Sequence, residues 1–87
     1  MCKIRNRAAR LLAEYEVTNT VGVQKGRYSF RTAKQDNNSG WWIVYETTPD
    51  GVGYTTAPNK RHAQWIIALG VVTHFDKVEC DCKEWCR

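Results

Sequence analysis

Residues 41–70 decide the fold, and they read Trp41-Trp42-Ile-Val-Tyr-Glu-Thr-Thr-Pro-Asp-Gly-Val-Gly-Tyr-Thr-Thr-Ala-Pro-Asn-Lys-Arg-His-Ala-Gln-Trp-Ile-Ile-Ala-Leu-Gly70. The first part is rich in tryptophan, tyrosine and β-branched residues, which suit a half-buried pleated strand. Pro49-Asp50-Gly51 favours a tight turn, because Pro fixes φ, Asp bonds to the backbone and Gly tolerates positive φ. Alternation then resumes at Val52, Tyr54 and Thr56. The sequence therefore predicts a β-hairpin over residues 41–57.

A helix over residues 59–69 is predicted directly after the hairpin. Asn59 suits the N-cap, because its side-chain oxygen can accept a hydrogen bond from the first turn. Pro58 at the first helical position is the alternative start. Apolar or small residues recur at i, i+3, i+4 and i+7 and predict a core-facing stripe of Ala63, Ile66, Ile67 and Gly70. Gly70 also fits the left-handed residue that ends many helices. Three polar residues are predicted to face solvent: Lys60, Arg61 and Gln64.

The remaining segments predict one more helix and further β structure. Residues 3–16 place apolar side chains at helical spacing. Residues 21–34 form either one long strand or two short strands around Lys25-Gly26. Residues 71–75 are apolar and β-prone, which favours a fourth strand or an extended arm. Because neighbouring side chains of a strand point to opposite faces, we expect one of Trp41 and Trp42 in the core and the other at the surface.

Together these elements predict a small α+β fold in a single domain over residues 1–87. The order is helix, antiparallel sheet of three or four strands within residues 20–57, and helix, with a Cys-rich C-terminal tail. We place the core in residues 3–75 and the tail in residues 76–87. The chain has 87 residues, a length that suits one domain. Six residues are predicted to lie in the core: Ile4, Leu11, Phe30, Ile43, Ile66 and Ile67.

The distribution of charge is the main clue to function. Lys and Arg number 13 against 9 acidic residues, a net charge of +4. A surplus of this size is typical of ordinary soluble proteins, and a basic surface for nucleic acid is the sharper alternative. The first helix carries a basic cluster without acidic neighbours, although Arg10 is spaced to pair with Glu14. Arg27 and Arg31 are predicted to share the wet face of the sheet. The candidate partner-binding residues are Lys3, Arg5, Arg7, Arg10, Arg27, Arg31, Lys60 and Arg61, together with Trp42.

The segment from Asn59 to Gln64, with Ala68 further on, resembles the start of the second helix in double-stranded RNA-binding domains. The order helix, three strands, helix is also that of this family. The resemblance implies that Lys60 and Arg61 contact phosphates. The family's Gly-Pro-x-His loop is absent, and Thr55-Thr-Ala-Pro58 replaces its glycines before the second helix.

The four cysteines are Cys2, Cys80, Cys82 and Cys86. Four thiolates suit tetrahedral zinc, but the C-x-C-x3-C spacing departs from paired C-x2-C knuckles. Two disulfides are a further alternative, which no export signal supports. We prefer free thiols to a zinc site, and a zinc site to disulfides; no cofactor is therefore expected, with zinc as the alternative.

No catalytic motif stands out in the sequence. It lacks a Gly-rich phosphate loop, a G-x-S-x-G elbow and an H-E-x-x-H pair. The leading hypothesis is a non-enzymatic protein that uses a basic face to bind nucleic acid or a nucleoprotein. The alternative is a protein-binding inhibitor or adaptor, directed at an acidic surface, with exposed aromatic residues inside a rim of arginines. No apolar run suits a signal peptide or a membrane span, so we expect a cytoplasmic protein without a membrane partner.

Overall fold

The computed structural model describes residues 3–35 and 40–77. Its elements are α1 (Lys3–Thr18), β1 (Gly22–Lys25), β2 (Tyr28–Lys34), β3 (Trp42–Thr48), β4 (Gly51–Ala57), α2 (Lys60–Gly70) and the π-helical turn η1 (Val71–Phe75). The four strands form one antiparallel sheet in the order β1-β2-β3-β4. The predicted α+β fold is confirmed, with four strands.

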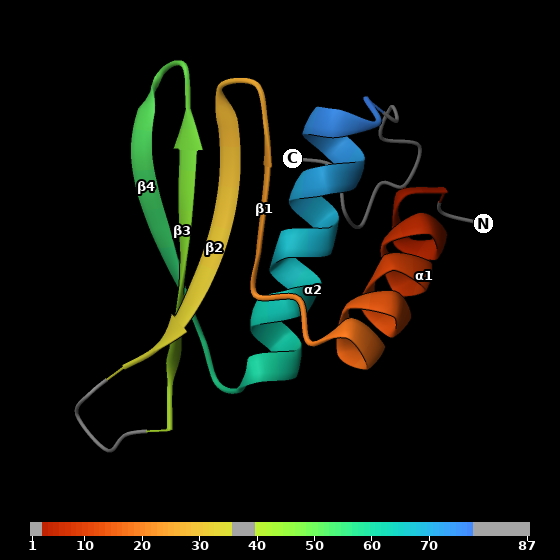
Figure 1. Cartoon of the computed structure of the whole chain (residues 1–87), viewed down its shortest axis with the longest axis vertical. Coiled ribbons are helices and arrows are strands. Elements are labelled where there is room, and N and C mark those ends of the chain that lie inside the picture. The colour runs from red at the N-terminus through yellow and green to blue at the C-terminus, as the bar shows by residue number, and fades with distance from the viewer. Residues whose placement is uncertain (1–2, 36–39, 78–87) are drawn as a thin grey trace.

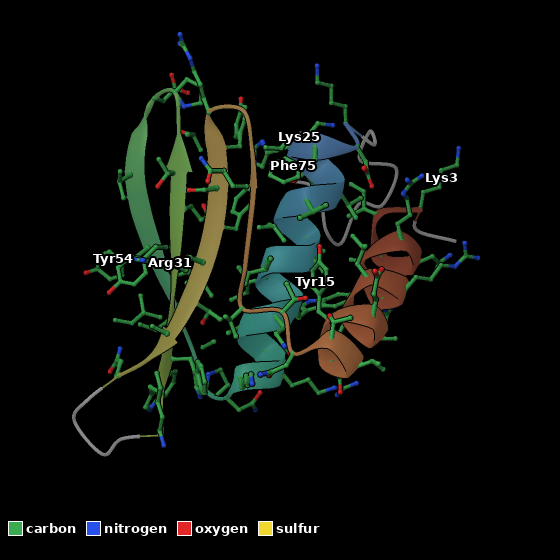
Figure 2. The ribbon with its side chains drawn as sticks, in the orientation of Figure 1. Lys3, Tyr15, Lys25, Arg31, Tyr54 and Phe75 are labelled. Atoms are coloured by element: carbon green, nitrogen blue, oxygen red, sulfur yellow. The ribbon has the colours of Figure 1, made fainter. Side chains whose placement is uncertain are left out.

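The elements stack in three levels: the sheet, α2 and then α1 (Figure 1). Helix α2 packs across β2, β3 and β4, and α1 packs against α2 and η1. One face of the sheet is therefore covered by α2. No element within residues 3–35 and 40–77 covers the other face, which we call the open face. Tyr54 and Arg31 lie on that open face, directed away from the helices (Figure 2).

The two hairpins follow the local turn signals of the sequence. Thr48 lies opposite Gly51, so the hairpin predicted over residues 41–57 is confirmed. Residues 21–34 form two strands, because Lys25 pairs with Tyr28 around the turn at Gly26 and Arg27. Gly26 has a φ of 61°, the positive value that the first central residue of a type II′ turn requires.

Helix α2 begins as the sequence predicts. Asn59 is the N-cap, and its Oδ1 accepts a hydrogen bond from the backbone N–H of His62 at 2.8 Å. The alternative start, with Pro58 inside the helix, is wrong because the helix begins at Lys60.

The predicted end of α2 is wrong, because Gly70 does not adopt a left-handed conformation. Its φ is −61° and the chain continues as η1, in which the N–H of Asp76 donates to the carbonyl of Val71 at 3.0 Å. Residues 71–75 are therefore neither a strand nor an extended arm. Val71 and Val72 are buried, and a short apolar run does not by itself distinguish a buried helix from a strand.

A close approach to β2 explains the glycine at position 70. A Cβ atom there would lie 2.9 Å from ring atoms of Phe30. The Phe30 ring is almost fully buried and also packs against His74 and Phe75 of η1, with ring centroids 5.8 and 5.6 Å away. The missing side chain thus lets α2 approach the sheet closely.

Gln64 connects α2 to α1 on the side of α2 away from the sheet. Its side chain is 3% exposed, so the prediction that it faces solvent is wrong. The Nε2 group donates hydrogen bonds to the backbone oxygens of Tyr15 at 3.2 Å and Thr20 at 2.9 Å. Tyr15 also accepts from the N–H of Thr20 at 3.0 Å while Asn19 has a φ of 56°, which is a Schellman end to α1.

The core lies between the sheet and α2 and between α2 and α1. Of the predicted core residues, Ile4, Phe30 and Ile67 are buried. Leu11, Ile43 and Ile66 are only partly buried. Ile43 lies on the open face because its neighbour Val44, which is fully buried, occupies the helix-facing position on β3. Trp41 is 44% exposed, as predicted for one of the pair, whereas Trp42 is half-buried and packs against the core without being part of it.

We expect Gly70→Ala to destabilise the protein. The added methyl group would press on Phe30, and overpacking costs about 1–3 kcal/mol, more than the gain of about 1 kcal/mol in helix propensity. Urea unfolding should therefore show a lower free energy of unfolding. Gly53→Ala is the matched control, since a Cβ at Gly53 meets no atom within 4 Å. In a Phe30→Leu background the cost of Gly70→Ala should shrink, and an equal cost there would contradict this contact.

We also expect Tyr15 to make stability depend on alkaline pH. Burial raises the pKa of its phenol, and the carboxylates of Glu14 and Asp76 raise it further. The unfolded chain loses this proton first, above about pH 10, so the contribution is complete below that pH and disappears as pH rises through the higher folded-state pKa. Tyr15→Phe should flatten the fall in unfolding free energy above about pH 10. The exposed Tyr54→Phe serves as control, and an unchanged slope in Tyr15→Phe would contradict this assignment.

Candidate nucleic-acid interface

Helices α1 and α2 run antiparallel, so the predicted basic residues are divided between two ends of the helical layer. At one end, Arg7 of α1 forms an ion pair with Asp76 just after η1, with Nη2 and Oδ2 3.1 Å apart. At the other end, Arg61 of α2 forms an ion pair with Glu16, with Nε and Oε1 3.1 Å apart. The basic face predicted from the sequence is therefore not a single compact patch.

A groove between α1 and α2 brings two of the predicted residues to one surface. It has a volume of about 470 Å³ and contains Arg5 and Arg61. The remaining lining residues come from both helices and from the N-cap: Ala9, Leu12, Asn59, His62 and Trp65. The groove thus combines two guanidinium groups with the partly buried indole of Trp65. Guanidinium groups bind phosphate in forked geometry, and an aromatic wall suits a base or sugar.

Sequence reasoning assigned no role to Trp65 or His62. Trp65 follows Arg61 by four residues, which places both on one side of a helix. That spacing was the available signal. It could not show that α1 would supply the other side of the groove, because the contact depends on tertiary packing.

The ion pairs on the helical layer are exposed. The side chains of Arg61 and Glu16 are 73% and 42% exposed, and those of Arg7 and Asp76 are 56% and 31% exposed. Exposed pairs of this kind contribute about 0–1 kcal/mol, so a phosphate can compete for the arginine. Arg10 and Glu14, both among the described residues, do not form the ion pair that their spacing favours. Arg10 is exposed on α1, and Lys3 is exposed at its first residue.

Lys60 and Trp42 meet near the start of α2. The Lys60 ammonium lies 6.0 Å from the centroid of the Trp42 indole and also donates to the side chain of Asn19. Trp42 is on the helix-facing side of β3, opposite Ala57 and Lys34. The Trp42 ring therefore packs against Lys60 from the sheet side, and it is not part of the open face.

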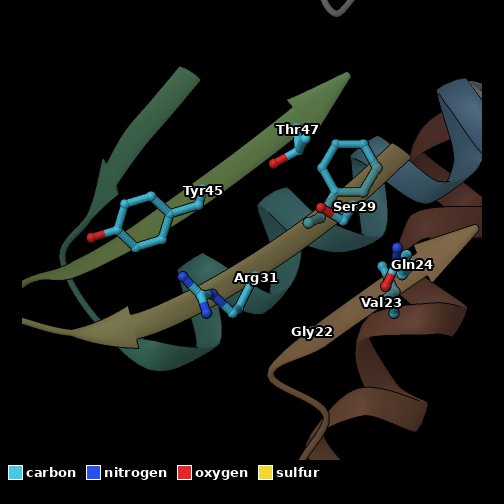
Figure 3. Close-up of a pocket in the computed structure, with 8 residues that line it drawn as sticks. Gly22, Val23, Gln24, Ser29, Arg31, Tyr45 and Thr47 are labelled. Carbon is cyan, nitrogen blue, oxygen red and sulfur yellow. The ribbon is translucent and has the colours of Figure 1, made fainter. Parts of the chain in front are cut away.

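The open face of the sheet has a second hollow, of about 450 Å³ (Figure 3). Arg31 of β2 and Tyr45 of β3 lie side by side there, with the guanidinium carbon 5.3 Å from the ring centroid. Ser29, Thr47 and Gln24 add polar groups. Arg27 does not line this hollow; it lies in the turn between β1 and β2.

The predicted metal ligands cannot be placed. Cys2, Cys80, Cys82 and Cys86 all lie outside the described residues. Within residues 3–35 and 40–77, no three His, Cys, Asp or Glu side chains gather in a way that could hold a metal ion. His74 instead stacks on Tyr28, with ring centroids 5.2 Å apart.

Comparison with protein-family models, with curated proteins and with solved structures finds no match to this chain. In the described part of the chain, each helix is too short or too polar to cross a membrane.

Proposed function

We propose that the protein is a non-enzymatic binding protein whose helical layer contacts the phosphates of nucleic acid, either free or within a nucleoprotein. The observation that carries this proposal is the groove between α1 and α2, which holds Arg5, Arg61 and Trp65 together. Phosphate contacts position a protein on nucleic acid without reading its sequence. The proposal therefore predicts affinity for many sequences.

The charge of the described residues supports this function. They include eleven of the 13 basic residues and five of the 9 acidic residues of the chain. Helix α1 has four basic residues before its first acidic residue, Glu14. Positive charge at the start of a helix opposes the helix dipole, so the dipole does not stabilise this cluster. An anionic partner gives it a physical reason.

The proposal does not specify duplex RNA. The resemblance to double-stranded RNA-binding domains rests on one turn of α2 and on the order helix, three strands, helix. The fourth strand of this fold departs from that order. What the groove supports is a phosphate-bearing partner, and the form of nucleic acid is a question for the binding experiment.

We expect the double substitution Arg5→Gln and Arg61→Gln to weaken binding to mixed-sequence oligonucleotides about tenfold at low salt. Loss of two phosphate contacts should also reduce the slope of log affinity against log salt by roughly 1.4 to 1.8. Fluorescence anisotropy across a salt series measures both quantities. Lys25→Gln with Lys34→Gln is the matched control, because it removes the same charge from the sheet. Equal effects of the two variants would remove the groove from the site, and no binding by the wild-type protein at low salt would overturn the function.

A second candidate is a protein-binding inhibitor or adaptor. The observation that favours it is the pairing of the half-buried Tyr45 on β3 with the exposed Tyr54 on β4, beside Arg31. Tyrosine and arginine are frequent anchors of protein interfaces. Capture of a protein from nuclease-treated lysate by the wild-type chain, lost in Arg31→Ala with Tyr45→Ala and retained in Arg5→Gln with Arg61→Gln, would favour this function over nucleic-acid binding.

For the cysteines we expect metal-free protein with four titratable thiols. Elemental analysis and thiol titration of protein purified without added metal check this. Near-stoichiometric zinc that is lost when Cys82 and Cys86 are replaced by serine would instead establish a zinc site. Such a site should also be lost on acidification, because thiolate ligands bind only when deprotonated.

A further inference from the structure

In the described part of the chain, strand β4 is an edge strand without the usual protection. Figure 1 shows it at the outer side of the sheet with no described element beyond it. Residues Gly51 to Thr56 are all exposed, with Val52 at 74% and Tyr54 at 72%. Natural edge strands are usually short, or carry charges, proline or a bulge that prevents pairing with another chain. The seven residues of β4 include no charged residue and no proline.

The pairing register shows which backbone groups of β4 are directed to the free edge. In an antiparallel pair, hydrogen-bonded and non-hydrogen-bonded positions alternate. Gly51 and Thr48 close a two-residue hairpin and occupy a hydrogen-bonded position. Every second residue after Gly51 therefore faces β3 with its N–H and C=O groups, and the residues between face outward. The outward set is Val52, Tyr54 and Thr56.

An independent contact supports this alternation. Going across the sheet, the same register puts Thr32 in a non-hydrogen-bonded position towards β3, opposite Val44. The backbone N–H and C=O groups of Thr32 should then point towards β1. The N–H of Thr32 does donate to the carbonyl of Val21 at 2.8 Å, on the β1 side.

From this arrangement we propose that β4 pairs with β4 of a second copy of this chain, antiparallel and about a two-fold axis at Tyr54. The outward set is symmetric about Tyr54, so each outward N–H of one copy meets an outward C=O of the other. Tyr54 lies opposite Tyr54, and Val52 lies opposite Thr56. Because β4 carries no charge, the pairing brings no like charges together.

Strand β4 of a second copy is a better partner for this edge than strand β1 of a second copy. Strand β1 has four residues, and it includes the charged Lys25. A head-to-tail contact of β4 with β1 would leave further edges open and would form filaments. Self-pairing of β4 closes after two copies. The proposal does not depend on the proposed nucleic-acid function.

Charge exchange at position 54 tests the dimer and its register together. We expect the wild-type chain to self-associate with a dissociation constant on the order of micromolar, because a strand pair buries less surface than a standard interface. Tyr54→Lys alone and Tyr54→Glu alone should be monomers in sedimentation equilibrium, since each places like charges directly opposite. An equimolar mixture of the two should recover the dimer. Recovery also shows that both variants are folded.

Thr47→Lys and Thr47→Glu are the matched controls, because Thr47 is beside Val52 on the same face but one strand inside the edge. Both should retain the dimer. In the wild-type chain, amide exchange at Val52, Tyr54 and Thr56 should slow as protein concentration rises. A wild-type monomer at all concentrations would overturn the proposal, as would a dimer that both Tyr54 variants keep or a mixture that stays monomeric.

Discussion

The rest of the structure depends on the close contact between Gly70 and Phe30. It fixes the distance between α2 and the sheet at the centre of the core, where the Phe30 ring lies within 3 Å of the position of a Cβ. Protein interiors are packed as densely as organic crystals, so there is no free space at this point for an additional methyl group. The same ring packs against His74 and Phe75. The contact thus also holds η1 against β2.

The opposite side of α2 is fixed by a polar contact. Burying an amide group whose N–H donors have no partner costs about 1–3 kcal/mol of folding stability. The buried Gln64 side chain therefore requires hydrogen-bond acceptors on the element that packs against it, which is α1. The Nε2 group of Gln64 meets two backbone carbonyls at the end of α1. One of these, Tyr15, belongs to the last turn, where carbonyls have no partner within the helix. The end of α1 and the middle of α2 therefore satisfy each other, and this sets the antiparallel packing that forms the groove of Arg5 and Arg61.

Local signals in the sequence predicted the elements that depend on neighbours along the chain. The turn at Pro49-Asp50, the N-cap at Asn59 and the helix over residues 3–16 are of this kind, and all are confirmed. The stripe of apolar or small residues correctly placed Gly70 towards the core. The burial of Gln64 and the close packing of Gly70 on Phe30 could not be predicted, because they depend on partners on α1 and β2. The burial of Val44 in preference to Ile43 was also not predictable, since both are apolar and only the register decides which faces α2.

In the candidate site, too, local features could be predicted from the sequence and tertiary contacts could not. The basic residues were evident from the sequence, but their grouping was not, because Arg5 and Arg61 meet only through the packing of α1 on α2. The packing also separates functions by face. The arginine groove lies on the helical layer, whereas the free edge of β4 is uncharged.

This separation has a consequence for the proposed dimer. Antiparallel pairing about a two-fold axis at Tyr54 keeps the open faces of both sheets on one side, because opposite residues in a strand pair point the same way. The helical layers of the two copies must then share the other side. Each dimer would carry two arginine grooves, one on each copy, related by the two-fold axis. A nucleic acid long enough to reach both would bind the second groove at high effective concentration, so two weak contacts would add up to a stronger one without any further change in the chain.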